Sequence, residues 1–226
     1  MSLELEVPFP VRLRIWGERA CFTRLEMKVE RFSYDVITPS AARGVIEAVY
    51  WKPQIVWRVD RIHVLNPIRF TSVRRNEVAS AVNTTAARSA MKAGKGALGL
   101  FCDDDRQQRA TTHLRDVDYV IEAHFELRDR SDSPAKHFDI VRRRAEKGQA
   151  FHQPYLGCRE FPASFAWVGS HADIPTPAEA LRGDRDLGFM LHDVDYDRDR
   201  AARFFRARMV DGVVDVPRWD SAEVVA

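Results

Sequence analysis

The stretch RDVDYVIEAHFELRDRSDSPAKHFDIVRRRAEKG, residues 115–148, decides the fold that the sequence predicts. Apolar and polar side chains alternate over Asp116–Leu127, and this period of two is typical of a strand with one buried face. Ser133 and Pro134 then have the residue types of a helix N-cap and a first helical position, and Gly148 is a typical helix end. The stretch therefore predicts a strand followed directly by a helix.

The chain before and after this stretch continues the same succession. Residues 11–15 alternate as a strand, a helix is expected from a Thr38 cap to Tyr50, and Gln54–Val64 alternates as a second strand. Two shorter strands are expected at Cys21–Lys28 and Glu30–Val36, and a last main strand is expected at Arg159–Val168. The order strand, helix, strand, strand, helix, strand predicts an α+β fold. We expect a ferredoxin-like (RRM-like) βαββαβ domain with an antiparallel sheet, which is also the architecture of RNA-recognition modules.

The composition changes after about residue 170. Residues 171–226 contain prolines, an acidic stretch and short strand signals, so we expect a small β-rich C-terminal domain, or a meander joined to the main sheet. Residues 1–170 are then the ferredoxin-like domain, with a basic loop at 71–100 that is polar and then glycine-rich. We expect this segment to be a long loop, with or without a hairpin.

Composition excludes several classes of protein. The chain is 45% apolar and 30% charged, as globular proteins are, and no apolar run reaches the length of a membrane span. Its three cysteines are widely spaced and form no CxxC pair, which favours a reducing, cytoplasmic compartment. The histidines show no HExxH-like spacing, so we expect no metal site, and no cofactor motif is present.

The charges are distributed unevenly along the chain. Residues 61–100 contain seven Lys or Arg and one acid, which favours a face for a polyanion such as RNA. The alternative is a solvated loop whose charges cluster by chance. The candidate RNA contacts are Arg69, Arg74, Arg75, Arg88, Lys92, Lys95, Arg109, His113 and Arg115.

Three residues are candidates for chemistry on a phosphodiester. Lys136 and His137 lie in the first turn of the helix that Ser133 caps, and Tyr50 ends the first helix. Two antiparallel helices on one sheet face bring such ends together, and an imidazole, an ammonium and a phenol suit metal-free RNA cleavage. The alternative is an interfacial aromatic beside a solvated lysine and a surface histidine. A Cys158–His152 nucleophilic pair is a weaker hypothesis.

Three segments of the chain resemble a known family. They are TPSAARGVIEAVYWKP at 38–53, RDVDYVIEAHFEL at 115–127, and AKH followed by RRRAEKGQAFHQPYLGCREF within 135–161. They resemble the type I-C CRISPR-associated proteins of the fifth Cas family, within the RAMP superfamily. The resemblance implies a metal-independent endoribonuclease that cuts the hairpin repeat of precursor CRISPR RNA. It also implies that the protein then stays on the processed RNA with the other subunits of the type I-C interference complex.

The resemblance assigns the catalytic roles to Tyr50, Lys136 and His137. It implies that Lys136 stabilises the transition-state charge, that His137 transfers a proton, and that Tyr50 activates or orients the 2′-OH. The glycine-rich C-terminal loop of many RAMP proteins is not evident in this sequence. Two alternatives stay open: a non-catalytic RNA-binding structural subunit, and a broader role that includes binding to duplex DNA.

Overall fold

The computed structural model of the chain describes residues 10–27, 29–96, 98–128, 132–196 and 198–226. The strands are β1 Val11–Ala20, β2 Ile55–Val64, β3 Phe70–Val78, β4 Arg106–Leu127, β5 Ser164–Trp167, β6 Asp184–Asp195, β7 Ala201–Val210 and β8 Val213–Asp215. The helices are α1 Pro39–Val49, α2 Thr84–Ala93 and α3 Pro134–Glu146, and the short 3-10 helices are η1 His171–Asp173 and η2 Glu179–Leu181. None of the helices in these ranges is long and apolar enough to cross a membrane.

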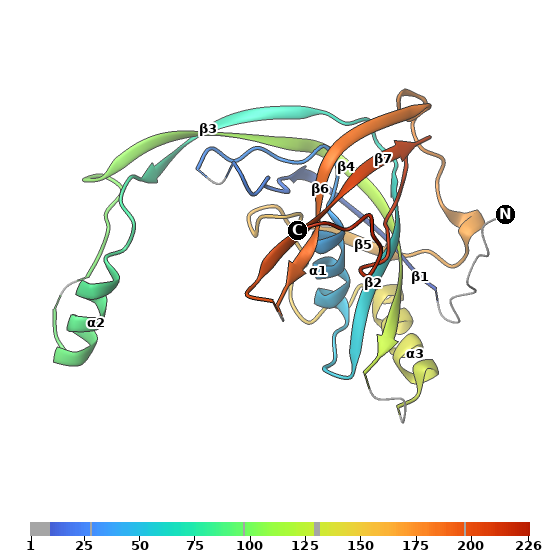
Figure 1. Cartoon of the computed structure of the whole chain (residues 1–226), viewed down its shortest axis with the longest axis horizontal. Coiled ribbons are helices and arrows are strands. Elements are labelled where there is room, and N and C mark those ends of the chain that lie inside the picture. The colour runs from blue at the N-terminus through green and yellow to red at the C-terminus, as the bar shows by residue number, and fades with distance from the viewer. Residues whose placement is uncertain (1–9, 28, 97, 129–131, 197) are drawn as a thin grey trace.

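The strands form a sheet in the spatial order β5-β1-β4-β2-β8-β7-β6 (Figure 1). Within it, β5, β1, β4 and β2 pair antiparallel throughout, in the order that two interleaved strand–helix–strand units produce. The prediction of a ferredoxin-like α+β fold is therefore confirmed. Strand β8 pairs with both β2 and β7, so the β-rich C-terminal part continues the same sheet. The division into two domains at residue 170 stays a prediction.

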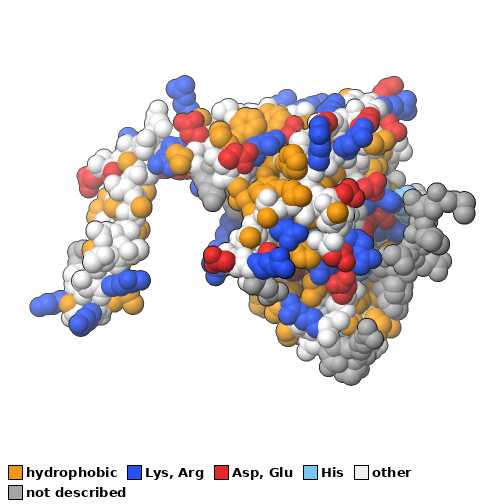
Figure 2. Space-filling view, in the orientation of Figure 1, with side chains coloured by type: hydrophobic (Ala, Val, Ile, Leu, Met, Phe, Trp, Pro, Cys, Tyr) orange, Lys and Arg blue, Asp and Glu red, His pale blue; other side chains and the backbone are white. Residues whose placement is uncertain are grey.

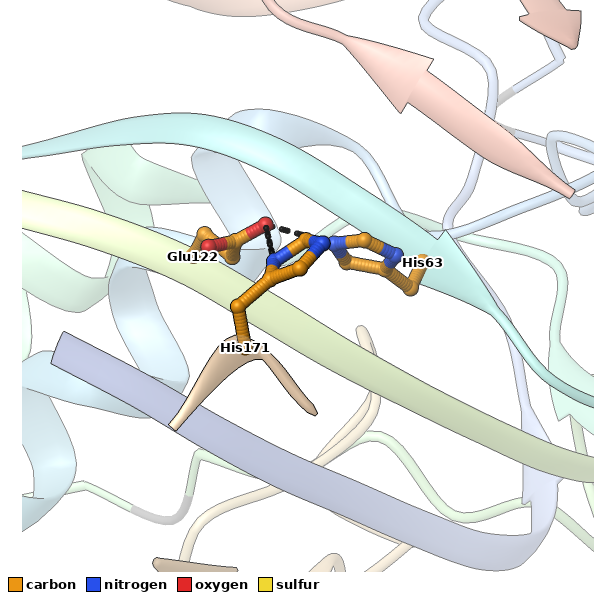
Figure 3. A group of neighbouring side chains, drawn as sticks. All are labelled: His63, Glu122 and His171. Atoms are coloured by element: carbon orange, nitrogen blue, oxygen red, sulfur yellow. Dashed lines mark hydrogen bonds and ion pairs between the residues drawn. The ribbon is translucent and has the colours of Figure 1, made fainter. Parts of the chain in front are cut away.

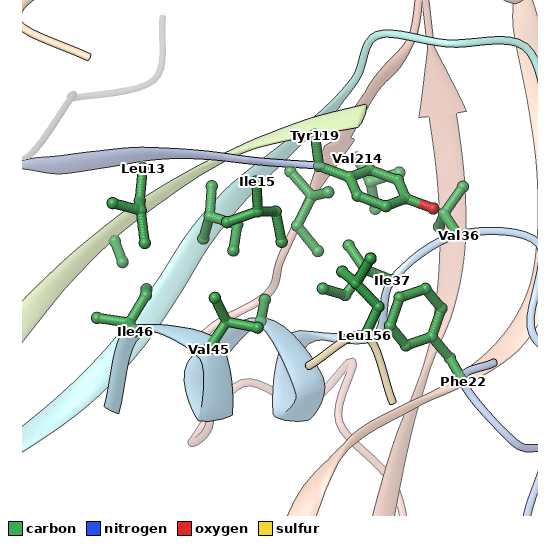
Figure 4. Close-up of a cluster of buried hydrophobic side chains, with 14 of the residues drawn as sticks. Leu13, Ile15, Phe22, Val36, Ile37, Val45, Ile46, Tyr119, Leu156 and Val214 are labelled. Carbon is green, nitrogen blue, oxygen red and sulfur yellow. The ribbon is translucent and has the colours of Figure 1, made fainter. Parts of the chain in front are cut away.

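Helices α1 and α3 cover one face of this sheet. Helix α1 begins where the sequence predicts it, because the Thr38 hydroxyl accepts a hydrogen bond from Ala41 N at 3.3 Å and Pro39 suits the first helical position. Helix α3 packs beside α1 and against β1 and β5. The apolar core between the helices and the sheet includes the following side chains (Figure 4): Leu13, Ile15, Val45, Ile46, Tyr119 and Leu156.

A two-stranded arm projects from the body of the protein, and α2 lies at its tip (Figure 1). Strand β3 pairs with the first half of β4, from Phe70 opposite Leu114 to Val78 opposite Arg106. Helix α2 has no buried residue, and its C-cap Gly94 adopts the left-handed conformation (φ 62°) that favours glycine. Of the two alternatives for residues 71–100, the structure shows the one with a hairpin, since β3 pairs with β4, whereas helix α2 was not expected. Strand β3 has no buried residue, so the apolar alternation that marks a buried strand face is missing from its sequence.

Three expected strands are corrected. The segments expected as strands at 21–28 and 30–36 form only isolated bridges, Thr23 with Ser33 and Phe32 with Thr112, and Lys28 lies outside the described residues. The last main strand is shorter than the expected 159–168, because only Ser164–Trp167 pairs with β1. The strand expected at Asp116–Leu127 is confirmed as the second half of β4.

Candidate functional site

Tyr50 and His137 form a buried hydrogen-bonded pair where α1 ends and α3 begins. Tyr50 is the C-cap of α1, and His137 lies one turn into α3, which Ser133 caps. The Tyr50 hydroxyl oxygen lies 2.8 Å from His137 Nδ1, and the two residues are only 1% and 2% exposed. The structure thus brings together two of the three expected residues, and His137 is not the surface histidine of the alternative interpretation.

Asp132 holds the opposite edge of the His137 ring. Its Oδ2 lies 2.8 Å from His137 Nε2, and its Oδ1 lies 3.4 Å from Lys136 Nζ. The hydrogen bond with His137 lowers the pKa of Asp132, so this carboxyl is ionised at neutral pH. An ionised carboxyl group has no hydrogen to donate and acts only as a hydrogen-bond acceptor. Neutral His137 therefore carries its hydrogen on Nε2 and accepts one from Tyr50 at Nδ1. Sequence reasoning missed Asp132, although it directly precedes the helix cap.

Aromatic and cationic side chains fix the position of Tyr50. Trp57 Nε1 donates to the Tyr50 carbonyl at 2.9 Å, and the Arg144 guanidinium lies 5.5 Å from the centre of the Tyr50 ring. On the other side, the Phe125 ring of β4 meets the His137 ring edge-on at 5.8 Å. Burial raises the pKa of Tyr50, so its hydroxyl stays protonated at neutral pH. Tyr50 is consequently placed to orient His137, and its expected action on a 2′-OH stays a prediction.

Lys136 lies on the solvent side of this pair. Its side chain is 61% exposed, and its ammonium lies beside the Asp132 carboxylate that faces His137 Nε2. This edge of the site therefore combines an exposed cation with an imidazole N–H that Asp132 covers. Such an edge can bind a phosphate oxygen and exchange a proton with a leaving oxygen.

Most of the expected RNA-contacting cations are exposed. Figure 2 shows Lys and Arg side chains at the end of the arm, over α2. The exposed residues of the expected set are Arg69, Arg74, Arg88, Lys92, Lys95 and Arg115. They extend from the base of the arm to its tip, so the arm offers cations along its whole length.

Three residues of that set are engaged inside the protein. Arg75 binds Glu160 at 2.6 Å, and Arg109 Nε lies 4.0 Å from Glu77. His113 is buried and stacks on a neighbouring aromatic ring, and burial lowers its pKa. The alternative interpretation of His113 as an exposed polar strand residue is therefore wrong, because its side chain faces the protein interior. Its expected contact with RNA stays a prediction, which this burial disfavours.

The structure does not pair Cys158 with His152. The Cys158 thiol lies 3.7 Å from the Cys21 carbonyl oxygen, to which it donates, and His152 Nδ1 donates to the Gln153 carbonyl at 3.2 Å. The proposed nucleophilic pair is absent from the contacts of these described residues, so this hypothesis is wrong.

A separate group of described residues has the geometry of a metal site. His63 of β2, Glu122 of β4 and His171 of η1 point their ligand atoms at one another (Figure 3), and all these atoms lie within 4.8 Å of each other. Glu122 faces away from the helices, since its neighbours Ile121 and Ala123 belong to the core beneath α1. This group therefore lies on the face of the sheet opposite Tyr50 and His137.

Comparisons with known proteins agree with this fold. A sequence model described as CRISPR-associated protein (Cas_Cas5), of the Cas_Cas5d type, matches residues 11–217. A protein of Mannheimia succiniciproducens named CRISPR pre-crRNA endoribonuclease Cas5d is 50% identical over 219 residues, 95% of this chain and 97% of its own. A protein of the same name from Thermus thermophilus is 40% identical over 92% of this chain and 91% of its own. A crystal structure described as a CRISPR-associated protein has the same fold, with a TM-score of 0.68 at 24% identity over 96% of each chain.

Proposed function

This chain belongs to the Cas5d family of CRISPR-associated proteins, and on that premise we propose that it is an endoribonuclease acting on precursor CRISPR RNA. The observation that carries the proposal is His137, held between the Tyr50 hydroxyl and the Asp132 carboxylate with the Lys136 ammonium beside it. Hydrogen bonds at both ring nitrogens fix the orientation of a histidine, and a fixed orientation favours proton transfer. The substrate proposed is the hairpin repeat of the precursor.

The proposed reaction is an internal transfer at phosphorus. The 2′-hydroxyl of the scissile nucleotide loses its proton to a water molecule as its oxygen attacks the adjacent phosphorus, and the bond from phosphorus to the 5′-oxygen breaks. Protonated His137 gives a proton to that 5′-oxygen, so the products carry a 2′,3′-cyclic phosphate and a 5′-hydroxyl. Lys136 stabilises the charge on the phosphoryl oxygens, a role that a metal ion fills in other nucleases. The reaction is therefore proposed to be metal-independent.

Asp132 would give way when the phosphate arrives. Its carboxylate occupies the His137 Nε2 edge and the Lys136 ammonium, which are the groups that the phosphate needs. Both ligands are anionic, so a phosphate can replace the carboxylate at the Lys136 ammonium and the His137 N–H without leaving these two donors unpaired. Tyr50 keeps His137 in place during the exchange because its hydrogen bond lies on the opposite edge of the ring.

The arm is proposed as the surface that keeps the protein on its RNA after cleavage. Its exposed cations suit RNA phosphates, and α2 buries none of its own residues. The same arm exposes Met91 and Phe101, which a neighbouring subunit would cover in an interference complex. The protein would then act as both the processing enzyme and a subunit of that complex.

Cleavage of the cognate repeat hairpin in EDTA tests the proposed function. We expect cutting at one position, with 2′,3′-cyclic phosphate and 5′-hydroxyl ends identified by mass spectrometry. The assay is run well below the melting temperature that the protein has in the same EDTA-containing buffer. Tight hairpin binding without turnover would overturn the endoribonuclease and leave an RNA-binding subunit. Cleavage that occurs only with added Mg²⁺ would overturn metal independence.

Removing the cations at the tip of the arm should weaken RNA binding and its dependence on salt. For the triple variant Arg88→Ala, Lys92→Ala, Lys95→Ala, we expect the slope of log K against log salt to fall in magnitude by about 2 to 3, because each phosphate contact contributes about 0.7 to 0.9. Gel shifts with the repeat RNA and with duplex DNA at several salt concentrations measure this. The matched control removes three exposed arginines of the C-terminal part, Arg182, Arg185 and Arg218. If the two triple variants had equal slopes of log K against log salt, Arg88, Lys92 and Lys95 would not be RNA contacts.

A further inference from the structure

We propose that His63, Glu122 and His171 bind a divalent transition-metal ion, with Zn²⁺ as the best fit, on the sheet face away from the candidate active site. The three side chains come from β2, β4 and η1 and converge on one point (Figure 3). Two imidazoles and a carboxylate form a ligand set that suits Zn²⁺, whereas Mg²⁺ and Ca²⁺ prefer oxygen ligands.

The distances fit a shared ion. Glu122 Oε1 lies 2.7 Å from His63 Nε2 and 3.5 Å from His171 Nδ1. In a tetrahedral site with zinc–nitrogen and zinc–oxygen bonds of about 2.0–2.1 Å, neighbouring ligand atoms are about 3.3 Å apart. The observed separations lie on either side of this value, so small side-chain movements make room for the ion.

The surroundings prepare the carboxylate as a ligand. Arg12 binds Oε2 at 2.9 Å and leaves Oε1 directed at the histidines, as groups around metal ligands commonly do. Arg61 Nη1 also lies 3.7 Å from Glu122 Oε1, but Arg61 Nε lies closer to Asp215 Oδ1, at 2.7 Å. Arg61 therefore keeps a carboxylate partner when an ion takes Oε1.

The position in the fold assigns a structural role to the ion. His63 and Glu122 are buried in the sheet, whereas His171 is 62% exposed and belongs to the connection between β5 and β6. Beside it, Val168 and Ile174 of the same connection pack on that face of the sheet. An ion would fasten this connection to β2 and β4, and its fourth coordination position would face solvent.

Zinc titration of the purified full-length chain, without RNA, tests the site. Bound metal is first removed from the protein with a chelator, and the chelator is then removed. The metal-free protein next competes for Zn²⁺ with a second, chromophoric chelator. We expect one ion per chain and a higher melting temperature. In His171→Ala we expect binding weakened by more than about tenfold, since even the loss of a group that only supports a metal ligand costs that much. Because His171 is exposed, this variant keeps its fold, and circular dichroism checks this.

A matched control separates this site from adventitious binding to histidine. His152→Ala removes another exposed histidine that is not one of these three ligands, and it should bind Zn²⁺ as the wild type does. Co²⁺ added to the wild type should give the visible absorption of a four-coordinate site, and His171→Ala should lose it. Equal Zn²⁺ affinity in wild type and His171→Ala would overturn the proposal and leave a hydrogen-bonded triad. Because no RNA is present, this outcome is independent of cleavage.

Discussion

His137→Ala should lower the rate of RNA cleavage by about 10²- to 10⁴-fold, the usual contribution of a general acid, while RNA binding persists. The imidazole is the proposed proton donor to the leaving 5′-oxygen, whereas RNA binding is proposed to depend on the exposed cations of the arm. Single-turnover cleavage at saturating protein measures the chemical step, and gel shifts measure binding. A variant that cuts at the wild-type rate would exclude His137 as the acid.

Two further variants show whether the loss is chemical. Tyr50→Phe keeps the buried ring and removes only the hydroxyl that faces His137 Nδ1, so we expect a smaller loss than in His137→Ala. This difference identifies Tyr50 as a positioning residue, and the pH profile of the remaining activity should also shift. His152→Ala serves as the control histidine and should leave cleavage unchanged. Thermal unfolding of each variant excludes loss of the fold, because His137 is buried.

A single 2′-deoxy substitution at the scissile nucleotide should abolish cleavage by the wild-type protein. The 2′-oxygen is the proposed nucleophile, so without it no 2′,3′-cyclic phosphate can form. Binding should hardly change, because it depends mainly on phosphate charge. The measurement compares cleavage and gel shifts for the all-RNA hairpin and the substituted one.

A shifted substitution provides the matched control for that hairpin. The same 2′-deoxy change one nucleotide to either side leaves the nucleophile in place and should permit cutting. Cleavage of the hairpin that lacks the scissile 2′-OH would mean that water attacks the phosphorus. The roles proposed for Lys136 and His137 would then need a different reaction.

The parts of the fold that cover the core could be predicted from the sequence. The half of β4 at Asp116–Leu127 alternates because one face meets the helices, and α1 begins at Thr38 because its side chain caps the first turn. The arm could not be predicted in the same way. Strand β3 has no buried residue, and helix α2 buries none of its side chains although its apolar residues share one helical face. A periodic pattern of apolar residues predicts an element with a buried face, and the elements of the arm have little buried surface.

The candidate site was predictable only in part. The fold order and the family resemblance placed Tyr50 near His137, and their 2.8 Å contact agrees with that expectation. The orientation of His137 by Asp132 depends on side-chain geometry that spacing does not encode. The His63–Glu122–His171 group escaped notice because its members come from three separate elements, and metal motifs are recognised by short spacings.

Strand β4 runs without interruption from the arm into the body, where Phe125 meets the His137 ring. Its 22 residues at about 3.3 Å each give a contour of up to about 70 Å, and the strand bends along it, with Asp116 at a positive φ of 53°. Under the proposed function, an RNA that touches both the cations of α2 and the Lys136–His137 edge would have to cross the space between the arm and the body (Figure 1). The protein would then select its substrate by reach as well as by sequence.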